Sequence, residues 1–417
     1  MALDGRPDSL GASQTSLVSV ASVALENAGA AAPENVLSIL GSRPDEAPAP
    51  ARAARGYIPT LDGWRALSIL GVMLCHGRGL VFGPEGTYPN PRLYAWLEHG
   101  ASGVDVFFAI SGYLICTLLL REEALHGKID LRGFYVRRSF RILPLYFCYL
   151  SVIASLTWAG PIALSKTDWW SCLLFWRNYE LARDMGSGGW YVGHFWSLSV
   201  EEQFYLFFPT LLAILGGARA RRIVPWLAVA TTLLHGLSLR LMPTSHFLAA
   251  TRIDALLWGC TYAFAFAHEG VRERARRWLT TPWLLGIGLA DVALVAIALV
   301  AMAGICGKLR GASMWLPATL PLLVLGTALH PGSLLGRLLE SRLLCWIGRL
   351  SYSLYIWQQL FLIDAPSSRL PVLEPFQTFP ANVVAAFLLA IASYYVIERP
   401  FLRLGRRVLG YPLAISR

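Results

Sequence analysis

Two ionisable residues lie in one apolar stretch, WRALSILGVMLCH, which holds Arg65 and His76 eleven positions apart. Eleven residues at about 100° each complete roughly three turns plus 20°, so both side chains project from one helix face, about 16 Å apart along the axis. That is about half of a ~30 Å hydrocarbon core, which places a His near the midplane, where ionisable groups are usually functional. The alternative is an interfacial Arg and a packed, hydrogen-bonded His.

The composition predicts a membrane protein. The chain has 417 residues, of which 55% are hydrophobic and 15% charged, and its mean hydropathy is +0.50. Globular domains average about 25% charged residues, so we expect an all-α, polytopic integral membrane protein. The net charge of +10 does not predict a nucleic-acid partner, because the basic residues fall in short loops and not along one stripe. The seven cysteines form no CxxC or Cys/His ligand spacing, so no metal site is expected.

The apolar segments set the expected topology. With the N-terminus in the cytoplasm, the inner segments hold 24 Lys and Arg residues and the outer segments 10. The positive-inside rule then predicts that both termini are cytoplasmic and that the number of spans is even. We expect a disordered cytoplasmic tail over 1–55, a transmembrane domain over 56–403 and a short basic cytoplasmic tail over 404–417. About ten segments are long enough to span a bilayer: 64–83, 104–121, 142–160, 196–215, 223–242, 251–268, 281–305, 311–330, 346–365 and 381–398.

A cluster of arginines lies on the predicted cytoplasmic side, in FYVRRSFRILPLY at 134–146. Arg137 and Arg141 are four positions apart and share a helix face, with Arg138 adjacent. Paired guanidinium groups suit a ligand rich in phosphate, because each binds phosphate oxygens through a planar fork. The alternative is an ordinary basic anchor that touches anionic lipid.

Two adjacent carboxylates, Glu201 and Glu202, begin the span in HFWSLSVEEQFYLFFP. Adjacent positions point about 100° apart, so at most one of them faces a given pocket squarely. A carboxylate at this depth needs a cation, which His76, Arg252 or Arg65 could supply. A structural ion pair with Arg252 is the alternative to a functional role.

Polar residues also occur in two other apolar segments. GVDVFFAISGYLI, at 103–115, holds Asp105 and the small pair Ser111 and Gly112, which permits close helix packing. TRIDALLWG, at 251–259, offers Arg252 and Asp254 as an intramembrane charge pair. We treat Asp105, Ser111, Arg252 and Asp254 as candidate substrate-binding or structural polar residues.

Five segments and a closing motif, taken in order, resemble the acyltransferase-3 family of integral membrane O-acyltransferases. They are LDGWRALSILGVMLCH, GVDVFFAISGYLI, FYVRRSFRILPLY, FWSLSVEEQFYL and LGRLSYSLYIWQQ, followed by YYVIERPF, and they cover roughly residues 57–403. The resemblance implies ten helices that take an acyl group, usually acetyl, from cytoplasmic acyl-coenzyme A. The group is placed on a hydroxyl, commonly of a cell-envelope carbohydrate such as a polysaccharide or lipopolysaccharide, or of another exported carbohydrate.

The resemblance also assigns roles to residues. The family's Arg and His, ten residues between them, fall on Arg65 and His76, and its loop arginines fall on Arg137 and Arg141. This chain departs from the family at Gln358, where His is frequent. Some members carry an appended hydrolase-like domain, but only about twenty residues follow the last predicted span, so we expect a stand-alone membrane domain.

These inferences combine into an expected mechanism. Acyl-coenzyme A (acetyl-coenzyme A) serves as donor substrate, with its anionic head on Arg137 and Arg141 and its arm or phosphates near Arg65. A neutral His76 acts as general base on the acceptor hydroxyl, and Glu201 or Glu202 orients the imidazole or the acceptor. A covalent acyl-His relay is the other route that the sequence leaves open.

Alternatives concern the acceptor and the class of protein. The acceptor is expected to be a carbohydrate or glycolipid, and a hydrophobic small molecule such as a macrolide sugar is the alternative. A glycan or lipid-linked transporter without transferase activity is a second class, although the halves show no internal repeat. We expect a multi-pass protein of the bacterial inner membrane that contacts the lipid bilayer, with no tightly bound cofactor, and a homodimer is left open.

Overall fold

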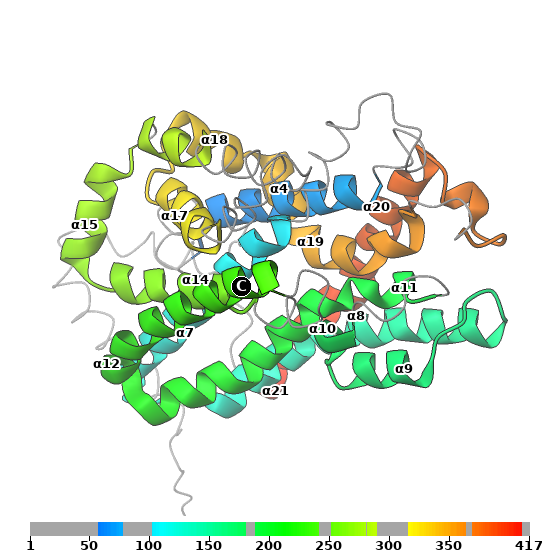
Figure 1. Cartoon of the computed structure of the whole chain (residues 1–417), viewed down its shortest axis with the longest axis horizontal. Coiled ribbons are helices and arrows are strands. Elements are labelled where there is room, and N and C mark those ends of the chain that lie inside the picture. Colours follow the sequence, from blue (N-terminus) through cyan, green and yellow to red (C-terminus); the bar gives the residue numbers. More distant parts are fainter. Residues whose placement is uncertain are drawn as a thin grey trace, which may run out of the picture. The chain divides into compact units, whose positions relative to one another are not determined.

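The computed structural model describes residues 57–77, 102–180, 188–241, 252–280, 282–289, 316–363 and 369–410. Secondary structure in these ranges is helical throughout, as the composition predicts (Figure 1). The expected tail over 1–55 lies outside the described residues. The principal helices are α4 (Pro59–His76), α7 (Gly103–His126), α8 (Leu131–Trp158), α9 (Lys166–Leu173), α10 (Arg177–Glu180), α11 (Trp190–Gly193), α12 (Phe195–Leu241), α14 (Asp254–Phe266), α15 (Glu269–Trp278), α17 (Leu316–Ala328), α18 (Leu334–Leu339), α19 (Arg342–Phe361), α20 (Ala381–Ser393), the π-helical turn η6 (Tyr394–Glu398) and α21 (Arg399–Val408).

Within the described ranges, four helical stretches are long and apolar enough to cross a membrane. They are Gly103–His126, Leu131–Trp158, Trp190–Ser238 and Ala381–Val408. Helix α21 continues to Val408, into the segment expected to be a tail. The predicted total of ten spans and the cytoplasmic placement of both termini stay predictions.

Helix α12 joins two of the predicted spans, 196–215 and 223–242, in one run of 47 residues. A helix of that length measures about 70 Å, far more than a ~30 Å hydrocarbon core. Gly216, with φ 70° and ψ 155°, interrupts the helical backbone between the two predicted spans. Figure 1 shows α12 bending sharply near its middle, so the two halves are separate segments, as predicted.

Helices α4 and α19 pack closely and position two parts of the site. A Cβ added at Gly348 of α19 would lie 2.6 Å from the carbonyl carbon of Asp62 in α4, so only glycine permits this approach. The contact fixes the face that α4 turns toward the interior, where Ala66, Ile69 and Val72 are buried. Arg65 and His76 are thereby held on one rigid element.

Helices α7 and α14 make the second close contact. A Cβ added at Gly112 of α7 would lie 2.8 Å from the carbonyl carbon of Leu256 in α14. The Sγ atom of Cys260 donates to the carbonyl of Gly112 across the same interface, at 3.4 Å. Gly112 therefore has the packing role expected of a small residue in a membrane helix.

Helix α8 carries the arginine cluster. It begins at Leu131, where the Asp130 side chain caps it by accepting from the Gly133 amide at 2.9 Å. Further along, the buried hydroxyls of Tyr146 and Tyr149 donate to backbone carbonyls of Cys172 and Tyr191. These bonds hold α8 against the segment that leads into α12. The arginines of α8 therefore lie opposite the glutamates of α12.

Candidate functional site

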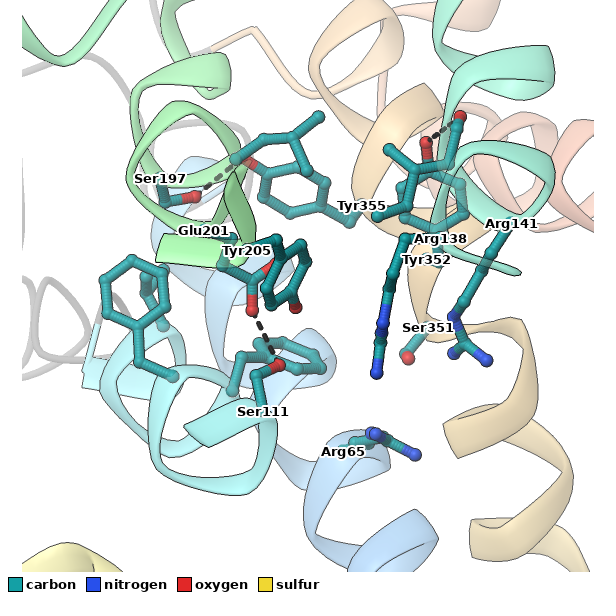
Figure 2. A pocket seen from close by; sticks show the side chains of 15 residues that line it. Arg65, Ser111, Arg138, Arg141, Ser197, Glu201, Tyr205, Ser351, Tyr352 and Tyr355 are labelled. Carbon is teal, nitrogen blue, oxygen red and sulfur yellow. Dashed lines mark hydrogen bonds between the residues drawn. The ribbon is translucent and has the colours of Figure 1, made fainter. Parts of the chain in front are cut away.

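A polar cavity of about 90 Å³ lies between α4, α7, α8, α12 and α19. Its apolar lining comes from Val104, Phe107, Phe108, Ile142 and Leu198. Figure 2 shows the remaining ten lining residues as labelled side chains. They are Arg65, Ser111, Arg138, Arg141, Ser197, Glu201, Tyr205, Ser351, Tyr352 and Tyr355.

Three arginines from two helices converge in this cavity. Arg65 comes from α4, and Arg138 and Arg141 from α8; Figure 2 shows the guanidinium groups of the latter two pointing toward that of Arg65. Arg65 Nη1 lies 3.2 Å from Asp62 Oδ1. The Arg138 guanidinium lies over the Tyr205 ring, 4.9 Å from its centroid. We name this set of three arginines the arginine pocket.

Glu201 is the one carboxylate among the cavity-lining residues. Its Oε1 accepts a hydrogen bond of 2.7 Å from Ser111 Oγ (Figure 2). Glu202 does not line the cavity, in agreement with the prediction that two adjacent glutamates cannot face one pocket together. Ser111, expected mainly as a packing residue, is thus a hydrogen-bond donor to the cavity glutamate, and the packing role belongs to Gly112.

Arg138, and not the expected Arg137, lines the cavity together with Arg141. Arg137 is absent from the lining, and its Nη2 lies 3.8 Å from Glu122 Oε2 of α7. Arg138, three positions before Arg141, lines the cavity in its place. Both spacings give a shared helix face, and packing of α8 against Tyr205 of α12 selects the second.

Polar residues of α7, of α14 and of the turn before α14 form pairs that differ from the expected ones. Arg252 forms its ion pair with Asp105 and not with Glu201, and Asp254 is a nearby negative charge without a direct ion pair to Arg252. Asp254 instead lies with its Oδ2 3.0 Å from Nδ1 of His235 in α12. Arg252 lies in the turn before α14, and Asp254 is the first residue of that helix, so the two side chains are not held on one helix face.

His76 ends α4 and lies outside the cavity lining. Its Nδ1 is 3.3 Å from the Oε1 atom of Gln358, the position at which the chain departs from the resembling family. The edge of its ring meets Trp190, with ring centroids 5.6 Å apart. Gln358 is fully buried.

The segment 190–197 contacts the cavity at one end and His76 at the other. Ser197 and Tyr355 line the cavity, and their hydroxyl oxygens are 2.7 Å apart (Figure 2). The Tyr355 hydroxyl also donates to the carbonyl of His194, the residue between α11 and α12. Trp190, at the start of α11, contacts His76. The arginine pocket and His76 are therefore joined through α4 and through the segment 190–197.

The residue types determine what this arrangement can bind. Asp62 pairs with Arg65 from outside the lining, so Arg138 and Arg141 remain against one lining carboxylate, Glu201. This arrangement favours an anionic ligand with oxygen acceptors. No group of three or more His, Cys, Asp or Glu side chains capable of holding a metal ion occurs among the described residues. Sequence reasoning singled out Arg65, Arg141 and Glu201, but it missed the tyrosines 205, 352 and 355, because aromatic residues in membrane helices are common and give no positional signal.

Comparisons with known proteins identify the family of the chain. The family profile described as "Acyltransferase domain" matches residues 58–399. Proteins named O-acetyltransferase OatA from Staphylococcus aureus strains NCTC 8325, COL and MRSA252 are each 27% identical over 384 residues, covering 85% of this chain. The chain spans 59% of the length of these relatives. No solved structure matches the chain.

Proposed function

Because the chain belongs to the acyltransferase family whose profile spans residues 58–399, we propose that it is a membrane O-acetyltransferase that uses cytoplasmic acetyl-coenzyme A. The observation that carries the proposal is the convergence of Arg65, Arg138 and Arg141 in one cavity of a membrane-embedded helical domain. Charged side chains in such a setting are expensive and mark ligand sites.

The donor is assigned from charge and position. Coenzyme A carries phosphates, and guanidinium forks bind phosphate oxygens in pairs. Arg138 and Arg141 lie in the first half of α8, which follows the loop at 127–130. We predict from the distribution of Lys and Arg that this loop is cytoplasmic. The anionic head of the donor rests on these arginines, and Arg65 contacts the phosphates or the arm that leads toward His76.

His76 supplies the proton transfer. Along α4 it lies about 16 Å from Arg65, a distance that the extended pantetheine arm of coenzyme A can bridge. A neutral imidazole takes the proton of the acceptor hydroxyl as the oxygen attacks the thioester carbonyl, and it returns the proton to the departing thiolate. Glu201, held by Ser111, balances the charge of the arginines. An acyl-His intermediate is the alternative route through the same residue.

The acceptor is the hydroxyl of an exported or cell-envelope carbohydrate. This choice follows from the resemblance of the whole membrane domain and from a catalytic imidazole that lies beyond the donor site, away from the cytoplasm. A hydrophobic small molecule such as a macrolide sugar is the second acceptor class.

An acetyl-transfer assay tests the proposal directly. The purified full chain in nanodiscs is given acetyl-coenzyme A labelled in the acetyl group, together with a panel of chito-oligosaccharides, extracted bacterial envelope polysaccharide and a macrolide. We expect label in one panel member and release of one coenzyme A thiol per acetyl transferred. Absence of both transfer and thiol release, together with movement of an unmodified glycan across the membrane of vesicles reconstituted with the same chain, would establish a transporter.

Orientation is tested separately, because the donor must meet the arginine pocket from the cytoplasm. Single Cys reporters in a Cys-depleted background are labelled from outside with an impermeant maleimide. We expect reaction at position 183 and none at position 128. Strong labelling at position 128 in intact cells places the loop before α8 outside and removes the cytoplasmic donor from the proposal.

A further inference from the structure

Gln358 has one half of its amide satisfied and the other half without a partner. The side chain is fully buried in α19, and its Oε1 lies 3.3 Å from Nδ1 of His76. Its Nε2, which carries two N–H donors, has no hydrogen-bond partner in the part of the chain that the structure describes. A buried donor left unsatisfied costs about 1–3 kcal/mol, so its retention beside His76 calls for an explanation.

The neighbouring glutamine differs in which half of its amide is paired: the Gln359 donor is paired, whereas its Oε1 has no hydrogen-bond partner among the described residues. Gln359 Nε2 donates to the carbonyl of Trp190 at 2.7 Å, and the Trp190 indole donates back to the carbonyl of Gln359 at 3.2 Å. This reciprocal pair fixes Trp190, whose ring edge meets His76. His76 and the unpaired donor of Gln358 are therefore held by rigid helices and share one immediate environment.

We propose that the Gln358 amide is a catalytic group of acetyl transfer: its Oε1 fixes the tautomer of His76, and its Nε2 donates a hydrogen bond to the oxyanion that forms on the thioester carbonyl. An amide oxygen only accepts, so His76 Nδ1 carries the proton and Nε2 of the imidazole is the basic nitrogen. The unpaired donor belongs to the same amide and so lies within a few ångströms of the imidazole.

Acetyl transfer at these positions begins with attack of the acceptor on the thioester. His76 Nε2 accepts the proton of the acceptor hydroxyl while the hydroxyl oxygen forms a bond to the thioester carbon. The π electrons of the carbonyl move to its oxygen, and the Gln358 N–H group stabilises the resulting negative charge. Collapse of this intermediate breaks the C–S bond, and the imidazolium gives its proton to the thiolate to yield free coenzyme A and the acetyl ester.

The inference deepens the proposed function and rests on it. A donor that is unpaired before the reaction and paired in the transition state contributes selectively to the rate, because it stabilises the transition state more than the bound substrate. This role explains why the Gln358 N–H group is buried without a partner, an arrangement that would be unfavourable if Gln358 served only in helix packing.

Two substitutions separate the donor from the acceptor half of the amide. Gln358→Met keeps the side-chain length and removes both functions, whereas Gln358→Glu keeps an acceptor for His76 and replaces the donor. We measure kcat and KM for acetyl-coenzyme A at pH 8 by release of coenzyme A thiol in the presence of the acceptor panel. We expect both variants to lower kcat about 10²- to 10³-fold with KM within about threefold, which is the usual effect of losing one oxyanion donor.

A matched control tests whether any buried glutamine would give the same result. Gln377 is also fully buried, but both polar atoms of its amide have partners. Its Oε1 accepts from the Leu370 amide at 2.8 Å, and its Nε2 donates to the Leu360 carbonyl at 2.7 Å. Gln377→Met should lower the melting temperature in detergent and leave kcat of the folded protein within about threefold. Gln358→His, which restores a ring N–H, should recover most of the rate lost in Gln358→Met.

The outcomes distinguish this inference from the proposed function. If the wild-type chain transfers acetyl groups and Gln358→Glu keeps more than about a tenth of its kcat, Gln358 only orients His76 and the donor role is overturned. Equal loss of kcat in Gln377→Met, or no recovery in Gln358→His, also overturns it. Failure of the wild-type chain to release coenzyme A contradicts the proposed function itself.

Discussion

The arginine pocket and the charge pairs of α7, α12 and α14 place charged side chains in the same helical domain in opposite ways. In the pairs, Arg252 meets Asp105, and the imidazole of His235 meets Asp254. In the pocket, three guanidinium groups share one cavity with a single glutamate. Each basic side chain of the pairs has its own carboxylate partner, whereas in the pocket Asp62 pairs with Arg65, and Arg138 and Arg141 share one lining glutamate.

The difference shows that charge in an apolar helix has two distinct explanations. A buried ion pair adds little net stability, but removing one member leaves an unpaired charge. An excess of one sign around a cavity is costly in the empty protein and is compensated by an anionic ligand. The two cases therefore predict different defects: loss of stability in the pairs and loss of binding or catalysis in the pocket.

The largest expected effect is on kcat, and it should differ between substitutions of His76 and of His235. His76→Ala should lower kcat for acetyl transfer by at least about 10²-fold, because a general base contributes 10²- to 10⁴-fold. His235→Ala removes one member of the pair with Asp254 and should lower the melting temperature while kcat of the folded protein changes little. Retention of more than about a tenth of wild-type kcat in His76→Ala contradicts the general-base role.

Arg138→Ala and Arg141→Ala should weaken acetyl-coenzyme A binding by about 10- to 100-fold each, since each removes a charge-assisted contact of about 1.5–3 kcal/mol. Lys at either position should restore only part of the affinity, because the charge returns without the bidentate fork. Calorimetric titration with a non-hydrolysable acetyl-coenzyme A analogue gives the dissociation constants. Unchanged affinity in both Ala variants makes the cavity arginines lipid or structural contacts.

The pair formed by Arg252 and Asp105 offers a test by double substitution. Arg252→Met leaves Asp105 buried and uncompensated, so we expect a stability loss of about 3 kcal/mol. Asp105→Leu in the same chain should recover most of the loss. Thermal unfolding in detergent measures both variants, and acetyl-coenzyme A affinity serves as the control. An affinity change as large as that of Arg141→Ala assigns Arg252 to the donor site.

Arg137 provides the smaller, matched comparison on α8. It lies outside the cavity lining and 3.8 Å from Glu122, and its side chain is 31% exposed. Arg137→Ala should change donor affinity by no more than about threefold, since exposed ion pairs contribute little. The same calorimetric titration decides the matter, and an effect equal to that of Arg138→Ala restores Arg137 to the donor site.

The smallest effect concerns pH and the pair of Asp168 with the buried Arg177 in the segment between α8 and α12. Burial raises the pKa of Asp168, but hydrogen bonds from Ser165 and the nearby Arg177 outweigh it and leave the pKa below its ordinary value. A carboxyl with a lowered folded pKa contributes stability above its unfolded pKa and loses it as pH falls through the folded pKa. Acid should therefore destabilise the wild type more than Asp168→Asn below about pH 4. Parallel melting curves for the two chains contradict this.

The sequence by itself determined the helical class, the membrane character and the family. These conclusions rest on local properties: long apolar segments, sparse charge and the order of motifs from Arg65 to Glu398. Such properties can be recognised without knowing how the helices pack. The face shared by Arg65 and His76 follows from helix periodicity alone. Periodicity also excluded a common pocket for Glu201 and Glu202, and the cavity contains only the first.

The tertiary structure decided which side chains meet. Arg137 and Arg138 are equally placed relative to Arg141 by helix geometry, and only the packing of α8 on Tyr205 selects Arg138. Asp105 and Arg252 are 147 residues apart, and Gln358 lies 282 residues beyond His76, so no local pattern links them. Contacts between helices that are distant in the chain depend on how many side chains of both helices pack together. The spacing of residues along the sequence does not specify this packing.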